Sequence, residues 1–100
     1  MPKIDIINIR RHAILDNREA QYALGMQYLE NKKMKDIDKA VFWFTKSAEL
    51  GLKESMSMLG NIYGTNKYGL YNKELGIYYL ELAYNHGDFT AALLLSLLKR

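Results

Sequence analysis

The chain has 100 residues, of which 49% are hydrophobic and 25% are charged, and its formal net charge at pH 7 is +3. This length and composition are typical of one folded domain and exclude a disordered tail. Cysteine is absent, which excludes disulfide frameworks, thiolate zinc sites and thiol catalysis. No apolar run is long enough to span a bilayer, so we expect no membrane partner.

Residues 1–16 are predicted to form an N-terminal capping segment. A helix could begin at Pro2, a tolerated first-turn position. The alternation over residues 4–6 fits an extended segment equally well, but we favour a capping helix that covers the first repeat. The apolar residues of the segment are Ile4, Ile7, Ile14 and Leu15. No secretory signal pattern is present at the start, and we therefore expect a cytoplasmic protein of bacterial type.

A first helix pair is predicted over residues 17–51. Asp16 can cap its first helix, and Asp36 can cap the second after a polar turn at 30–35. Gly51 supplies a left-handed exit from the second helix. The residues expected to face inward recur at helical spacing; they are Ala20, Ala23, Leu24, Tyr28, Ala40, Val41, Phe44 and Ala48.

A second helix pair, over residues 52–87, repeats the first. Its helices are expected to begin near Lys53 and after a cap at Asn72, with a turn at 64–71 between them. The repeated elements are Leu24-Gly25 with Leu59-Gly60, Trp43-Phe44 with Tyr78-Tyr79, Ala48 with Ala83, and Gly51 with Gly87. The last pair is 36 residues apart and the others 35, so we place one inserted residue near the end of the second helix. A period of this length indicates stacked helical repeats.

Gly25 and Gly60 lie inside predicted helices, where glycine costs roughly 1 kcal/mol relative to alanine. We interpret both as positions where the backbone of the paired helix approaches closely, because a side chain there would push the helices apart. Ser96 occupies the matching place in a third, partial repeat over residues 88–100.

The last helix, from a cap at Asp88 to about Lys99, is apolar nearly all round and should therefore be buried. A second copy of the chain, a partner protein or the N-terminal segment could cover it. We favour a homodimer, because an isologous contact needs only one patch. The expected self-association residues are Leu94, Leu95 and Leu98.

No constellation for catalysis, a cofactor or a metal is found in the sequence. His86 is expected at a helix C-terminus, where its charge favours the dipole, and His12 at the surface. Ser55 and Ser57 have no neighbouring base. The glycines of residues 64–69 lack the order of a phosphate-binding loop. We therefore expect no enzyme, no cofactor and no metal.

The first repeat resembles a SEL-one-like repeat, a relative of the tetratricopeptide repeat. The residues that carry the resemblance are Glu19 to Gly25, Tyr28, Asp36, Lys39-Ala40, Trp43-Phe44, Lys46 to Ala48, and Gly51. The second repeat departs from the pattern at Leu75, Tyr78 and Leu82, and the first at Asn31. The resemblance implies an all-α, right-handed solenoid of antiparallel helix pairs that serves as an adaptor or scaffold.

The resemblance also implies binding of a protein or peptide through a concave face lined by the first helices. By this geometry the partner-binding residues are Tyr22, Met26, Ser57, Asn61, Leu93 and Leu97. An N-terminal segment folded over this face is the alternative. The function we predict is a non-catalytic binding module, in one version an immunity protein that blocks a bacterial toxin. The alternatives are a self-assembling subunit and nucleic-acid binding through Arg10-Arg11 and Lys32-Lys33-Lys35, clusters too sparse for us to expect a nucleic-acid partner.

Overall fold

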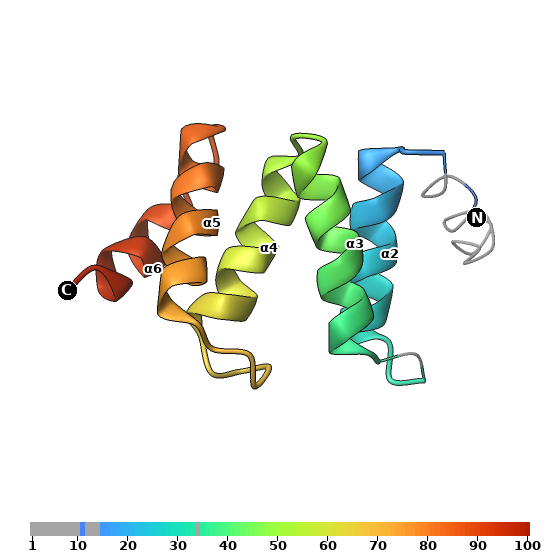
Figure 1. The fold of residues 1–100 in the computed structure, drawn as a ribbon, viewed down its shortest axis with the longest axis horizontal. Coiled ribbons are helices and arrows are strands. Elements are labelled where there is room, and N and C mark those ends of the chain that lie inside the picture. The colour runs from blue at the N-terminus through green and yellow to red at the C-terminus, as the bar shows by residue number, and fades with distance from the viewer. Residues whose placement is uncertain (1–10, 12–14, 34) are drawn as a thin grey trace. The chain divides into compact units, whose positions relative to one another are not determined.

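The computed structural model describes residue 11 and residues 15–33 and 35–100. Every regular element in these ranges is a helix (Figure 1), which confirms the all-α prediction. The helices are α2 (Arg18–Glu30), α3 (Ile37–Glu49), α4 (Lys53–Gly64), α5 (Lys73–Asn85) and α6 (Ala91–Leu98). They fall into two compact units, unit 1 (Met1–Leu52) and unit 2 (Lys53–Arg100). The predicted capping segment and His12 lie largely outside the described residues.

The helices of unit 1 begin where a side chain can accept the first free backbone N–H groups. Asp36 caps α3, as predicted, because its Oδ1 accepts from Lys39 N at 3.1 Å. The cap of α2 is Asn17, whose Oδ1 accepts from Ala20 N at 2.9 Å. The prediction of Asp16 was wrong by one residue: Asp16 has a φ of 60°, a left-handed conformation that aspartate tolerates in turns.

The two helices of unit 1 pack through a small apolar core around Phe44 and Leu24, both completely buried. A methyl group placed on Gly25 would lie 2.7 Å from Phe44 Cδ1, far inside normal carbon contact. The three atoms nearest to that position all belong to the Phe44 ring, so the space over Gly25 is filled by a side chain and not by the crossing backbone that we expected. Gly51 ends the helix pair with a φ of +92°, as the sequence predicted.

Unit 2 contains an even closer crossing of α4 and α5. A methyl group on Gly60 would lie 2.5 Å from Leu80 Cδ2 and 3.3 Å from Leu80 N. Gly64 lies one turn after Gly60 on α4 and faces Gly76 of α5. A methyl group on Gly76 would lie 2.9 Å from Gly64 Cα, so the two backbones are in direct contact here. The predicted cap at Asn72 is confirmed by its acceptance from Leu75 N at 3.1 Å.

The register of the second repeat differs from our prediction. Helices α2 and α4 begin 35 residues apart, at Arg18 and Lys53, but α3 and α5 begin 36 apart, at Ile37 and Lys73. The inserted residue therefore lies in the connection between α4 and α5, and its placement near the end of the second helix was wrong. As a result Leu80, and not Tyr79, takes the place of Phe44.

This shift changes which residues of α5 face inward. Tyr78, which the 35-residue register pairs with Trp43, is 56% exposed, whereas Leu80 is buried. In the 35-residue register Ala40 pairs with the large residue Leu75. In the observed register it pairs with Gly76, so the second repeat also has a small residue at this position. The apparent departure from the repeat pattern at Leu75 came from the misplaced insertion, whereas at the position of Trp43 the second repeat still has a tyrosine, Tyr79.

The last helix, α6, begins at Ala91, two residues later than predicted, and lies against α5 (Figure 1). It also contacts α4, because Leu98 Cδ1 and Leu94 Cδ2 lie 3.0 and 3.3 Å from the position of a methyl group on Gly64. The turn before α6 is held by Asp88, whose carboxylate accepts from Thr90 N at 3.2 Å.

Candidate functional site

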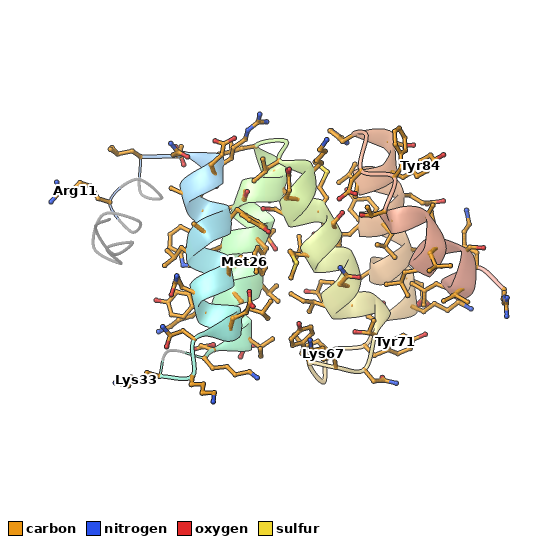
Figure 2. All side chains as sticks on the ribbon, turned by 180° about the vertical axis from the view of Figure 1, so that it is seen from behind. Arg11, Met26, Lys33, Lys67, Tyr71 and Tyr84 are labelled. Atoms are coloured by element: carbon orange, nitrogen blue, oxygen red, sulfur yellow. The ribbon has the colours of Figure 1, made fainter. Side chains whose placement is uncertain are left out.

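The predicted partner-binding residues occupy three helices. Tyr22 and Met26 lie on α2 in unit 1, and the other four lie in unit 2, on α4 and α6. Figure 2 shows Met26 on α2, away from the turn that carries Lys33.

In unit 1 both residues of the predicted face are half-buried. The ring of Tyr22 lies 5.9 Å from that of Phe44, at an interplanar angle of 49°. Tyr22 therefore touches the paired helix, whereas the sequence placed it on the face turned away. Aromatic contact of this kind fixes the ring but leaves part of its surface accessible.

In unit 2 the two predicted residues on α4, Ser57 and Asn61, differ in how accessible their polar groups are to a partner. The hydroxyl of Ser57 donates to the carboxylate of Asp88. This hydrogen bond, followed by that from Thr90, lowers the pKa of Asp88 below its usual value. Ser57 therefore helps to hold the turn before α6, because hydrogen bonds to the charged form stabilise the carboxylate. Asn61, one turn along, is exposed.

The two residues on α6 are both exposed. Leu93 is 74% exposed and Leu97 is 48% exposed. Large apolar side chains held this far out on an ordered helix form an apolar surface available for contact.

The residues predicted for self-association lie on the other side of α6. Leu98 is buried and Leu94 is half-buried, both toward Gly64. Leu95 is half-buried and lines a surface hollow with residues of α5 and α6. The structure thus directs Leu94 and Leu98 into unit 2.

Sequence reasoning missed an exposed aromatic residue that occurs at the same position of α3 and α5. Phe42 is 53% exposed and stands edge-on to Trp43 at 5.0 Å, and Tyr78 meets Tyr79 in the same way at 5.0 Å. The signal was available in the sequence as a 36-residue spacing. The 35-residue spacing pairs Trp43 with Tyr78 and conceals this match.

Groups that could perform chemistry are not brought together in the part of the chain that is described. No set of three or more His, Asp or Glu residues there could hold a metal ion. His86 ends α5, as predicted, with Nδ1 2.8 Å from Leu82 O. Gly69 lies in a turn with a φ of +76°, and its N–H donates to Asn66 O at 3.4 Å. Among the described helices, none has both the length and the apolar character to cross a membrane.

The basic residues of the α2–α3 connection, Lys32, Lys33 and Lys35, are exposed. Lys33 N donates to Asn31 Oδ1 at 2.9 Å, so the turn is ordered by a local hydrogen bond. The other basic cluster, Arg10-Arg11, lies partly outside the described residues, and the absence of a nucleic-acid partner stays a prediction.

Comparison with known proteins gives two findings. The family model described as Sel1 repeat matches residues 18–52 and 53–88. A solved structure, described as a Sel1 repeat protein from Oxalobacter formigenes, is similar with a TM-score of 0.78 and 25% sequence identity. The similarity covers 91% of this chain and 69% of that one. No curated protein matches the chain significantly.

Proposed function

The chain belongs to the Sel1 repeat family, and on this premise we propose that it binds a partner protein or peptide through the face of its first helices. Sel1 repeats generally mediate protein–protein interaction. The observation that carries the proposal for this chain is the exposure of Leu93 and Leu97 on α6. Exposed apolar residues on a rigid helix are the usual anchors of an interface.

Each unit offers its own apolar contacts, Tyr22 and Met26 in unit 1 and Leu93 and Leu97 in unit 2, where Asn61 adds an exposed polar group. Leu93 and Leu97 are one turn apart, as are Tyr22 and Met26, so each pair presents two side chains along one helix side. Methionine and tyrosine adapt to different partner surfaces at small cost. In unit 2, a partner with an apolar helix side or an extended apolar segment fits the contacts of Leu93 and Leu97. The Ser57 hydroxyl donates a hydrogen bond to Asp88, so in this proposal Ser57 positions α6 and does not contact the partner.

A finer version of the proposal is an immunity protein that works in the cytoplasm and neutralises a bacterial toxin. It is supported by the resemblance to a family in which some bacterial members have this role. Co-expression with the product of a neighbouring gene tests it. Co-purification and rescue of the cells would support it, and failure of both would contradict it.

The binding face is tested by single substitutions on folded protein. With a partner obtained in this way, Leu93→Asp should raise Kd at least about tenfold, as expected for an interface anchor. Tyr78→Asp is the matched control, because Tyr78 is also a large, exposed side chain but lies on α5. Equal losses from the two variants would contradict a face made by the first helices.

Self-assembly through α6 is the second candidate. It is favoured by the exposure of Leu93 and Leu97 beside the half-buried Leu95. Sedimentation equilibrium separates the candidates, since a homodimer should dissociate on dilution and shift to monomer in Leu97→Glu. A chain that stays monomeric at high concentration would eliminate this candidate.

A further inference from the structure

A surface hollow of about 260 Å³ lies where the end of α5 meets α6. Tyr84 contributes from α5, near the end of unit 2 opposite the turn with Lys67 and Tyr71 (Figure 2). The lining residues on α6 and at its end are Ala92, Leu95, Ser96 and Lys99. None of the lining residues belongs to the face proposed above for partner binding.

The repeat register identifies this hollow. Counting 36 and then 35 residues back from Leu95 gives Leu59 and Leu24, which are completely buried under α5 and α3. The same steps from Ser96 give Gly60 and Gly25, both buried. In α6, Leu95 is only half-buried and Ser96 is exposed. The hollow is thus the surface that α2 and α4 present to their paired helices.

We propose that this hollow receives one amphipathic α-helix of a partner protein, which lies on α6 as α3 lies on α2 and α5 on α4. The docked helix runs antiparallel to α6, as in a helical hairpin, and completes a third helix pair. The two pairs within the chain show what such a helix must bring to the contact.

The charge of the docked helix follows from Lys99. The positions equivalent to Lys99 are Tyr63 in α4 and Tyr28 in α2. The Tyr28 ring has Lys39 Nζ of α3 5.6 Å from its centroid, and the Tyr63 ring stacks on Tyr79 of α5 at 6.1 Å. At the end of α6 the equivalent residue is the cationic Lys99, and Arg100 follows it. Lys99 pairs with Glu81 at 2.8 Å, but both side chains are about half exposed, so the pair is weak and exchangeable. A docked helix therefore carries an acidic first turn beside Lys99.

The size of the central residue follows from Ser96. Gly25 and Gly60 leave space for Phe44 and Leu80, which would lie 2.7 and 2.5 Å from an added methyl group. Ser96 already carries a side chain, so the residue that crosses it must be small, such as alanine.

A second copy of this chain meets these demands poorly. The helices α2 to α5 are already paired within their units, α2 with α3 and α4 with α5, so α6 is the helix that a second copy could offer. An antiparallel α6 would place its first turn beside Lys99, and that turn contains no acidic residue. Charge complementarity therefore favours a different protein.

The probe for the test is a 14-residue peptide with the sequence of residues 36–49, carrying Phe44→Ala and Lys39→Glu; we call it the acidic peptide. A lactam on its outer side stabilises the helix, because a free peptide of this length is marginally helical. Fluorescence anisotropy with the full chain at low salt measures Kd. A second peptide, the basic peptide, carries Phe44→Ala but retains Lys39 and tests the charge. A third carries Lys39→Glu but retains Phe44 and tests the size.

The acidic peptide should bind, and each of the other two should bind at least about tenfold more weakly. Lys99→Glu in the protein should reverse the preference between the acidic and the basic peptide. Ala92→Arg, a change at an exposed position, should weaken binding at least about tenfold, whereas Tyr78→Arg should not. Circular dichroism checks that the variants are folded.

Three results would overturn the proposal. The first is no saturable binding of the acidic peptide up to about 1 mM. The second is an equal effect of Ala92→Arg and Tyr78→Arg. The third is a homodimer that Ala92→Arg dissociates, which would make the second copy the occupant. Since Leu93 and Leu97 take no part in this contact, the face proposed for partner binding stands or fails separately.

Discussion

The Gly64–Gly76 crossing in unit 2 predicts the effect of Gly76→Ala. The new methyl group would lie 2.9 Å from Gly64 Cα and 3.0 Å from Gly64 N, whereas carbon atoms pack at about 3.5–4.0 Å. Helices α4 and α5 would have to separate by more than half of an ångström, on the order of 0.6–1 Å, and Leu98 would lose its place beside them.

The expected change is a net loss of stability. Overpacking of a core costs about 1–3 kcal/mol, and the higher helix propensity of alanine returns at most about 1 kcal/mol. Because backbone atoms cannot move aside like a side chain, we take the upper part of the range, about 2–3 kcal/mol. Subtracting about 1 kcal/mol leaves a net loss of about 1–2 kcal/mol, which should lower Tm by about 4–16 °C at about 4–8 °C per kcal/mol for a domain of this size. Thermal and urea denaturation followed by circular dichroism measure it.

Gly60→Ala is the matched comparison, because the atom nearest its methyl group is Leu80 Cδ2, in a side chain. Leu80→Ala should relieve this clash, giving a favourable coupling of about 1 kcal/mol in a double-mutant cycle. Leu98→Ala should rescue Gly76→Ala little, because the closest atoms there are backbone. A Gly76→Ala protein more stable than the parent, or fully rescued by Leu98→Ala, would refute the backbone contact.

Three further predictions concern the turns and caps. Ser57 and Thr90 hold the pKa of Asp88 below its usual 3.8; the charged carboxylate therefore stabilises the fold above about pH 4, and this contribution is lost as the pH falls through the lower folded-state pKa. Asp88→Asn should accordingly flatten the dependence of the urea midpoint on pH between about 5 and 2, and parallel curves for the two proteins would contradict this. Gly51→Ala places a methyl group on a residue with a φ of +92° and should cost about 1–2 kcal/mol, so an unchanged urea midpoint would be inconsistent with that conformation. Asn72→Ala should lose about 1 kcal/mol of helix capping, whereas Asn72→Asp should retain it; equal losses would show that the cap does not stabilise α5.

The sequence predicted the helix pairs well, because their ends depend on short local patterns. Asp36 and Asn72 each stand three residues before the N–H group whose hydrogen bond they accept. Gly51 and Gly87 both adopt the left-handed conformation that ends a helix. Such signals need no knowledge of the partner helix, and the family resemblance added the pairing of the helices.

The packing of unit 2 was predicted less well, because adjacent aromatic residues make the register ambiguous. Tyr78-Tyr79 and Tyr79-Leu80 both fit the pattern of Trp43-Phe44, and only the length of the connection after α4 distinguishes them. The Gly64–Gly76 contact depends on that register, so the same error concealed it. At the candidate site, the exposure of Leu93 could be predicted from its helix position, whereas the bond between Ser57 and Asp88 required the fold.

The local character of the helix contacts has a consequence for how the chain is made. In unit 1 the hydrogen bonds Ser47 Oγ to Arg18 O and Arg18 Nη1 to Leu50 O join residues only 29 and 32 apart. Contacts of such short range allow folding within about microseconds to milliseconds. Synthesis proceeds at about 5–20 residues per second, so the first hairpin should close while the ribosome is still adding the second. The nascent chain would then expose one unfinished hairpin at a time.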